Sequence, residues 1–62
     1  MNFEQRQQVL EQLPKGTVIT KIYTAFENSE TRVIVKLPGE NWETRYAVRF
    51  SEEGYPHITL KP

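Results

Sequence analysis

From Thr17 onward the chain alternates with a period of two residues, and this alternation constrains its fold more than any other feature. The runs "TVITKIYTAFE", "TRVIVKL" and "WETRYAVRF" place large apolar or uncharged side chains at alternate positions, and the first two are rich in β-branched residues. Successive side chains of a β-strand point to opposite faces of a sheet. The three runs therefore predict strands over residues 17–27, 30–37 and 42–50.

The connections between these runs are short and rich in turn-forming residues. Asn28-Ser29 separates the first two runs, and Pro-Gly-Glu-Asn at residues 38–41 separates the second and third. Both sequences are typical of tight turns between adjacent antiparallel strands. Because a hairpin turn fixes which residues face one another, the strand register follows by counting outward from each turn.

The predicted register keeps the apolar side chains of both hairpins on one face of the sheet. Counting from the first turn places Lys21 opposite Lys36, and Tyr23 opposite Ile34. Counting from the second turn places Val33 opposite Tyr46, Ile34 opposite Arg45, and Arg32 opposite Ala47.

A helix is expected before the first strand and a short strand after the third. Asn2 and Gln5 have the spacing of a capping box, and apolar side chains then recur at helical intervals. These signals predict a helix over residues 3–13, which ends at the proline and glycine of "LPKG". Gly54 suits a left-handed turn, and residues 57–60 then predict a fourth strand.

The sequence therefore predicts a single α+β domain over residues 1–62, with an N-terminal helix packed on one face of an antiparallel meander sheet of three to four strands (α-β-β-β-β). The expected core comprises Phe3, Val9, Leu10, Leu13, Val18, Ile22, Phe26, Val33, Val35, Leu37, Trp42, Tyr46, Val48, Phe50, Ile58 and Leu60. A chain of 62 residues without cysteine has no disulfide or thiolate metal site to support so small a core.

The charges are balanced overall but are unevenly placed. Eight basic residues match eight acidic ones, all glutamates, so the formal net charge is zero, which is not typical of a nucleic-acid-binding protein. The predicted alternation of side chains along each strand nevertheless places six of the basic residues on the sheet face opposite the helix. These are Lys21, Arg32, Lys36, Arg45, Arg49 and Lys61, with His57 beside them. Most glutamates fall on the helix or in the turns.

This basic sheet face has two interpretations. In the first, it binds an anionic partner, with Lys21, Tyr23, Arg32, Ile34, Lys36, Arg45 and Arg49 as the binding residues. In the second, its long charged side chains only cover the sheet and keep the domain soluble. If the face binds, a protein partner with an acidic surface, reached through this face or a sheet edge, is favoured over low-specificity DNA or RNA binding. The glutamates in the turns would repel a long phosphate backbone.

Catalytic chemistry has little support in the sequence. His57 is the single imidazole, and without aspartate or cysteine the chain has no familiar metal-ligand set or catalytic triad. We therefore expect no enzymatic activity, no metal and no cofactor; a nuclease built on His57 and a glutamate is the remaining catalytic hypothesis. No signal-peptide pattern or membrane-spanning apolar run is present, so the sequence predicts a cytoplasmic protein that does not contact a membrane. The oligomeric state stays open.

Overall fold

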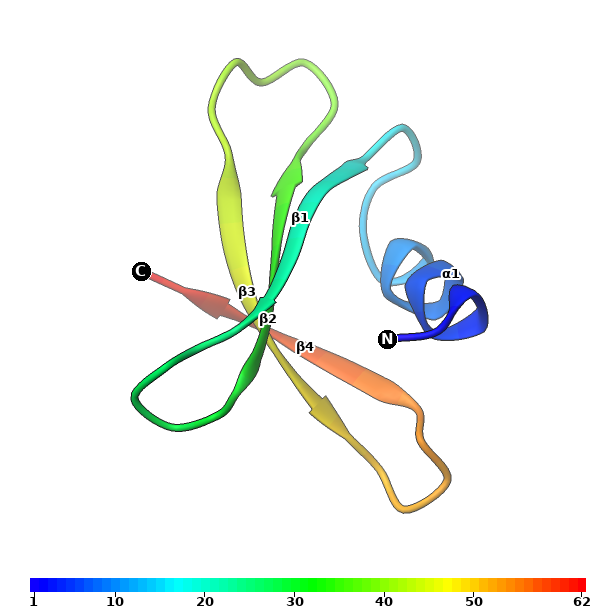
Figure 1. Cartoon of the computed structure of the whole chain (residues 1–62). Coiled ribbons are helices and arrows are strands. Elements are labelled where there is room, and N and C mark those ends of the chain that lie inside the picture. The colour runs from blue at the N-terminus through cyan, green and yellow to red at the C-terminus, as the bar shows by residue number, and fades with distance from the viewer.

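The computed structural model describes all residues 1–62 and confirms the predicted α-β-β-β-β order. The helix α1 spans Phe3–Glu11, and the strands are β1 (Val18–Thr24), β2 (Thr31–Lys36), β3 (Thr44–Phe50) and β4 (Pro56–Lys61). The strands form one antiparallel sheet in the order β1-β2-β3-β4. Figure 1 shows α1 on one side of this twisted sheet, while no element covers the other side. The helix, nine residues long, falls far short of the length that crossing a bilayer requires.

The helix begins as its sequence predicts and ends two residues earlier than expected. The side chain of Asn2 accepts a hydrogen bond from the Gln5 N–H at 2.7 Å, and the Gln5 side chain accepts one from the Asn2 N–H at 3.0 Å. This capping box satisfies two N–H groups that a helix start leaves without partners. Gln12 forms the C-cap, and its side chain then reaches across to β4.

The second hairpin has the predicted register, whereas the first is shifted by two residues. Val33 faces Tyr46 and Ile34 faces Arg45, as expected. In the first hairpin, Lys21 faces Ile34 instead of Lys36, and Tyr23 faces Arg32 instead of Ile34.

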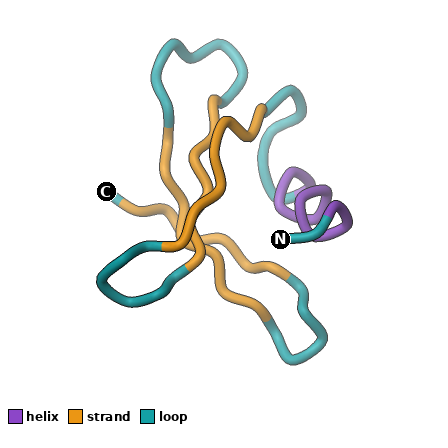
Figure 2. The backbone as a smooth tube through the Cα atoms, in the orientation of Figure 1, coloured by secondary structure: helices purple, strands orange, loops and turns teal.

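The shift has its origin in the turn. A two-residue hairpin turn of the common type needs positive φ at both central residues, but of Asn28 and Ser29 only Ser29 has one, at 57°. The Ser29 N–H instead bonds to the carbonyl of Ala25, and the Ala25 N–H bonds to that of Glu30. The connection, drawn as a long loop in Figure 2, is therefore wider than predicted. Because the shift is an even number of residues, the side chains of Ile22, Val33 and their neighbours keep their predicted faces.

A β-bulge in β1 changes the parity of its first residues. The register slips between Ile19 and Lys21, so Thr20 is the extra residue. Ile19 faces Val35 and packs against the core, whereas Val18 faces Lys36 and is 58% exposed. The prediction that Val18 belongs to the core is wrong for this reason.

The core is smaller than the sequence predicts. Val9 of α1 and three sheet residues, Val33, Val35 and Val48, form its buried centre, with partly buried side chains around it. The expected core residues that are exposed are Phe3, Val18, Phe26, Trp42, Phe50 and Leu60.

Apart from Phe3, which lies on α1 itself, and Val18, which the bulge turns to the other face, the exposed residues lie where α1 does not cover the sheet. Phe26 and Trp42 fall in loops, because β1 ends at Thr24 and β3 begins at Thr44. Leu60 faces Tyr46 on the helix side of the sheet but remains 60% exposed. One short helix cannot cover four strands.

Candidate functional site

The basic face, defined here as the sheet face opposite α1, brings the predicted basic residues together. Its middle row crosses all four strands, because Lys21 faces Ile34, Ile34 faces Arg45, and Arg45 faces Lys61. A second row joins Tyr23, Arg32, Ala47 and Thr59 in the same way. Arg49 faces His57, and Lys36 faces Val18, at opposite ends of the face.

Arg32 is held in ion pairs within the chain and is not available as an open binding residue. Its Nε lies 3.2 Å from Oε1 of Glu30, and its Nη2 lies 3.3 Å from Oε1 of Glu27. The side chains of Arg32 and Glu30 are only 12% and 15% exposed. Lys61 extends the cluster, with its Nζ 3.8 Å from the same Glu30 oxygen.

This ion-pair cluster corrects the prediction of an almost purely basic face. The sequence placed Glu27 and Glu30 in or beside the first turn, but Glu30 lies two residues before Arg32 and therefore shares its face. That spacing was a signal for the ion pair. Ala25 and Ala47 are buried although α1 does not cover this face.

Four basic residues of this face have no side-chain carboxylate within ion-pair distance. They are Lys21, Lys36, Arg45 and Arg49, and each is exposed. Within this group, Arg45 donates a hydrogen bond from Nη2 to the Pro62 carbonyl, at 3.3 Å. We call these four residues the free cations.

Tyr23 lies among these charges and is perturbed by them. The Lys21 Nζ stands 5.5 Å from the centre of its ring. The guanidinium groups of Arg45 and, next, Arg32 favour the ionised phenol and lower the pKa of Tyr23 from its usual value of 10.0. The same contact with Tyr23, followed by that with Glu30, raises the pKa of Arg32.

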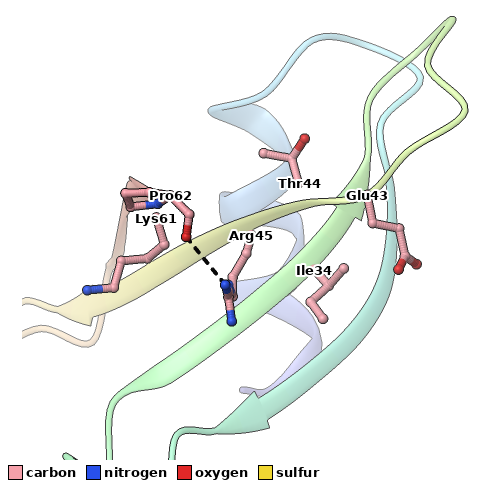
Figure 3. Close-up of a pocket in the computed structure, with 6 residues that line it drawn as sticks. All are labelled: Ile34, Glu43, Thr44, Arg45, Lys61 and Pro62. Carbon is pink, nitrogen blue, oxygen red and sulfur yellow. Dashed lines mark hydrogen bonds between the residues drawn. The ribbon is translucent and has the colours of Figure 1, made fainter.

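A shallow depression of about 360 Å³ lies on the basic face, lined by Ile34, Glu43, Thr44, Arg45, Lys61 and Pro62. Figure 3 shows Arg45 between Ile34 and the Lys61–Pro62 segment, with its bond to the Pro62 carbonyl. Ile34 is the single hydrophobic side chain of the lining. Glu43 is held on the Ile34 side by a 2.7 Å hydrogen bond from the Thr20 hydroxyl. The depression therefore combines an apolar contact with one free cation.

His57 lies at the margin of this face and has no carboxylate partner. Its ring packs against that of Tyr55, with centroids 5.1 Å apart and planes inclined by 59°. No hydrogen bond in the structure joins His57 to a glutamate. The structure thus places His57 beside Arg49, as expected, but without the acidic partner that the nuclease hypothesis requires.

Comparisons with protein-family models, with curated proteins and with solved structures found no match to this chain.

Proposed function

We propose that this protein is a small, non-enzymatic interaction module that docks on a partner protein through its basic face. The partner carries an acidic surface. The observation that supports this proposal is the set of free cations, Lys21, Lys36, Arg45 and Arg49, which share one sheet face and have no internal side-chain carboxylate partners. Like charges held together on one face raise its potential and speed the approach of an oppositely charged surface.

The size of this face suits a protein interface. The molecule measures 33 × 25 × 16 Å, so its broad side has room for the roughly 800 Å² that each partner of a standard interface buries. Exposed ion pairs contribute only about 0.2–1 kcal/mol each, so the charges alone give modest affinity. Tyr23 and Ile34, both partly buried between the basic residues, supply the apolar contact.

Nucleic-acid binding through the same face is the alternative, and the ring of Tyr23 would offer a base a stacking surface. The carboxylates of Glu27, Glu30 and Glu43 on and around this face oppose it. A continuous phosphate backbone would meet these glutamates wherever it overhung the free cations. A protein partner can instead place its own acidic side chains opposite the cations alone.

The test compares charge-reversal variants on and off the basic face. Wild type captures a stoichiometric partner from extracts of its source, and the purified partner then gives a Kd over a salt series. Because repulsion replaces attraction at two sites, Lys21→Glu combined with Arg45→Glu weakens binding at least about tenfold. Lys36→Glu also weakens it, whereas Lys15→Glu, the same change at an exposed position off the face, leaves the Kd unchanged.

Folding of every variant is checked by circular dichroism. Equal capture by wild type and the double variant would contradict the proposal.

A second experiment measures binding of mixed-sequence duplex and single-stranded oligonucleotides to the same variants. Oligonucleotide binding that weakens steeply with salt and is lost in the double variant would favour nucleic acid over a protein as the ligand of this face.

A further inference from the structure

The two edges of the sheet are protected to different degrees. At the β4 edge, the Gln12 side chain donates from Nε2 to the Pro56 carbonyl at 2.6 Å, and its Oε1 accepts from the Ile58 N–H at 3.3 Å. This amide therefore pairs with β4 as the backbone of a neighbouring strand would. Pro56 itself has no N–H to offer. Of the backbone groups that another strand would use at this edge, the Pro56 carbonyl and the Ile58 N–H are thus bonded to Gln12, and the Pro56 N–H is absent.

The β1 edge has no such protection. The Ala25 N–H bonds to Glu30, so alternation along the strand turns the backbone groups of Lys21 and Tyr23 toward β2. The N–H and C=O groups of Ile22 and Thr24 consequently point outward. No side chain makes a hydrogen bond to any of these four groups. The bulge at Thr20 limits the regular open edge to residues 21–24.

A depression follows this edge, and its lining carries two cations, while the Thr20 hydroxyl of the lining donates to the carboxylate of Glu43 at 2.7 Å. The depression encloses about 260 Å³ and is lined by Arg6, Ile19, Thr20, Lys21 and Ile22. Neither Arg6 of α1 nor Lys21 of β1 has a carboxylate within ion-pair distance. The open backbone groups of Ile22 thus lie between two cations, with the partly buried Ile22 side chain as an apolar contact.

We propose that the β1 edge accepts an extended, acidic segment of the partner protein as a fifth strand of the sheet. This inference rests on the proposed function and names how the partner is held: by backbone hydrogen bonds to Ile22 and Thr24, with acidic side chains near Arg6 and Lys21. A second copy of this chain fits poorly. Pairing two β1 edges about a two-fold axis would bring together two copies of the same cationic patch.

The experiment uses the whole ¹⁵N-labelled protein and a defined probe, a blocked eight-residue peptide of alternating glutamate and valine. The control is the same peptide N-methylated at every backbone nitrogen, which keeps the charge but removes the strand donors. The expected result is slower hydrogen exchange of the Ile22 and Thr24 amides in the complex. The N-methylated peptide binds at least about tenfold more weakly, because several backbone hydrogen bonds are lost.

A variant gives an independent readout. Thr24→Pro removes one outward N–H without touching the bonds to β2, and Thr24 is exposed, so the sheet is expected to tolerate it. We expect Thr24→Pro to weaken binding of the glutamate–valine peptide. Thr59→Pro would not serve as a control, because Thr59 is paired with Ala47 of β3. If Thr24→Pro unfolds the domain, the N-methylated peptide still decides the question on wild type.

Three outcomes overturn the inference. In the first, the peptide shifts resonances of Arg45 and Arg49 without protecting Ile22 and Thr24, which leaves docking on the basic face intact. In the second, the two peptides bind equally well. In the third, Ile22 and Thr24 become protected with rising protein concentration alone, which identifies a second copy as the occupant.

Discussion

Arg32 and Arg45 show how differently two arginines on one sheet face can behave. Arg32 is bound to Glu27 and Glu30 and nearly covered, so removing it would leave Glu30 largely buried without its main cation. Arg45 is exposed, donates a hydrogen bond to the Pro62 carbonyl, and is the largest cause of the lowered pKa of Tyr23. A substitution of Arg32 therefore affects stability first, whereas a substitution of Arg45 affects what the face can bind.

Tyr23 reports the charge around it through its titration. Because its pKa is lowered, the folded protein holds the tyrosinate more tightly than the unfolded chain does. The resulting stabilisation is complete above the usual value of 10.0 and disappears as the pH falls through the folded-state pKa. Absorbance at 295 nm should therefore show a tyrosine that ionises below pH 10.0, and Tyr23→Phe should remove this component.

Two arginine substitutions provide the matched comparison for this titration. Arg45→Met removes the largest cause of the shift and should move the Tyr23 midpoint upward. Arg49→Met makes the same change on the same face, but Arg49 is not among the groups that perturb Tyr23. Equal shifts in both variants would show that the general field of the face, and not contact with Arg45, is responsible.

At the level of elements, α1 is joined to the sheet by glutamines as well as by its apolar side. The Gln5 side chain donates to the Gly54 carbonyl at 2.8 Å, and Gln12 pairs with Pro56 and Ile58. These bonds link residues 44 to 49 positions apart in the chain and hold α1 beside β4. The helix thereby covers the β4 edge and leaves the β1 edge open.

Gln12→Ala should release this link. The substitution removes two hydrogen bonds to β4, and since each contributes about 0.5–1.5 kcal/mol while alanine slightly favours the helix, we expect a loss of about 1 kcal/mol in unfolding free energy. Hydrogen exchange at the Ile58 amide should become faster. Gln7→Ala, the same change at an exposed helix position without a side-chain hydrogen bond, should alter neither quantity. An unchanged Ile58 amide in Gln12→Ala would contradict the edge-capping role.

For the whole molecule, stability depends on a very small buried centre. Four valines form it, and six of the larger hydrophobic side chains are exposed. A domain of this length has a free energy of unfolding of only about 3–9 kcal/mol. Each buried valine therefore carries a large share of the stability.

Two valine-to-alanine variants test this distribution. Val33 is fully buried, so Val33→Ala removes two methyl groups from the core and leaves a cavity, which costs about 2–3 kcal/mol. Val18→Ala makes the same chemical change at a 58% exposed site and should cost less than about 0.5 kcal/mol. Urea denaturation followed by circular dichroism measures both. Similar losses would mean that Val18 belongs to the core after all, and that the Thr20 bulge does not form in solution.

Much of the candidate site could be predicted from the sequence, and each wrong prediction has a specific physical cause. The period of two placed Lys21, Arg45 and Arg49 on one face, and the structure gathers them there. The pairing of Lys21 with Lys36 was wrong, because neither the wide first turn nor the bulge has a strong local signal. The counter-ions of Arg32 were missed because Glu27 and Glu30, predicted in or beside the first turn, were not counted on the basic face.

The sequence by itself determined the order of the elements, the capping box at Asn2 and the face on which most side chains lie. These are local properties, set by backbone geometry and by the identity of neighbouring residues. Only the tertiary structure decided the register of the first hairpin, the exposure of Val18 and Leu60, and which basic residues are neutralised. Those outcomes depend on how a nine-residue helix and four twisted strands share a limited apolar surface, which is a property of the assembled chain.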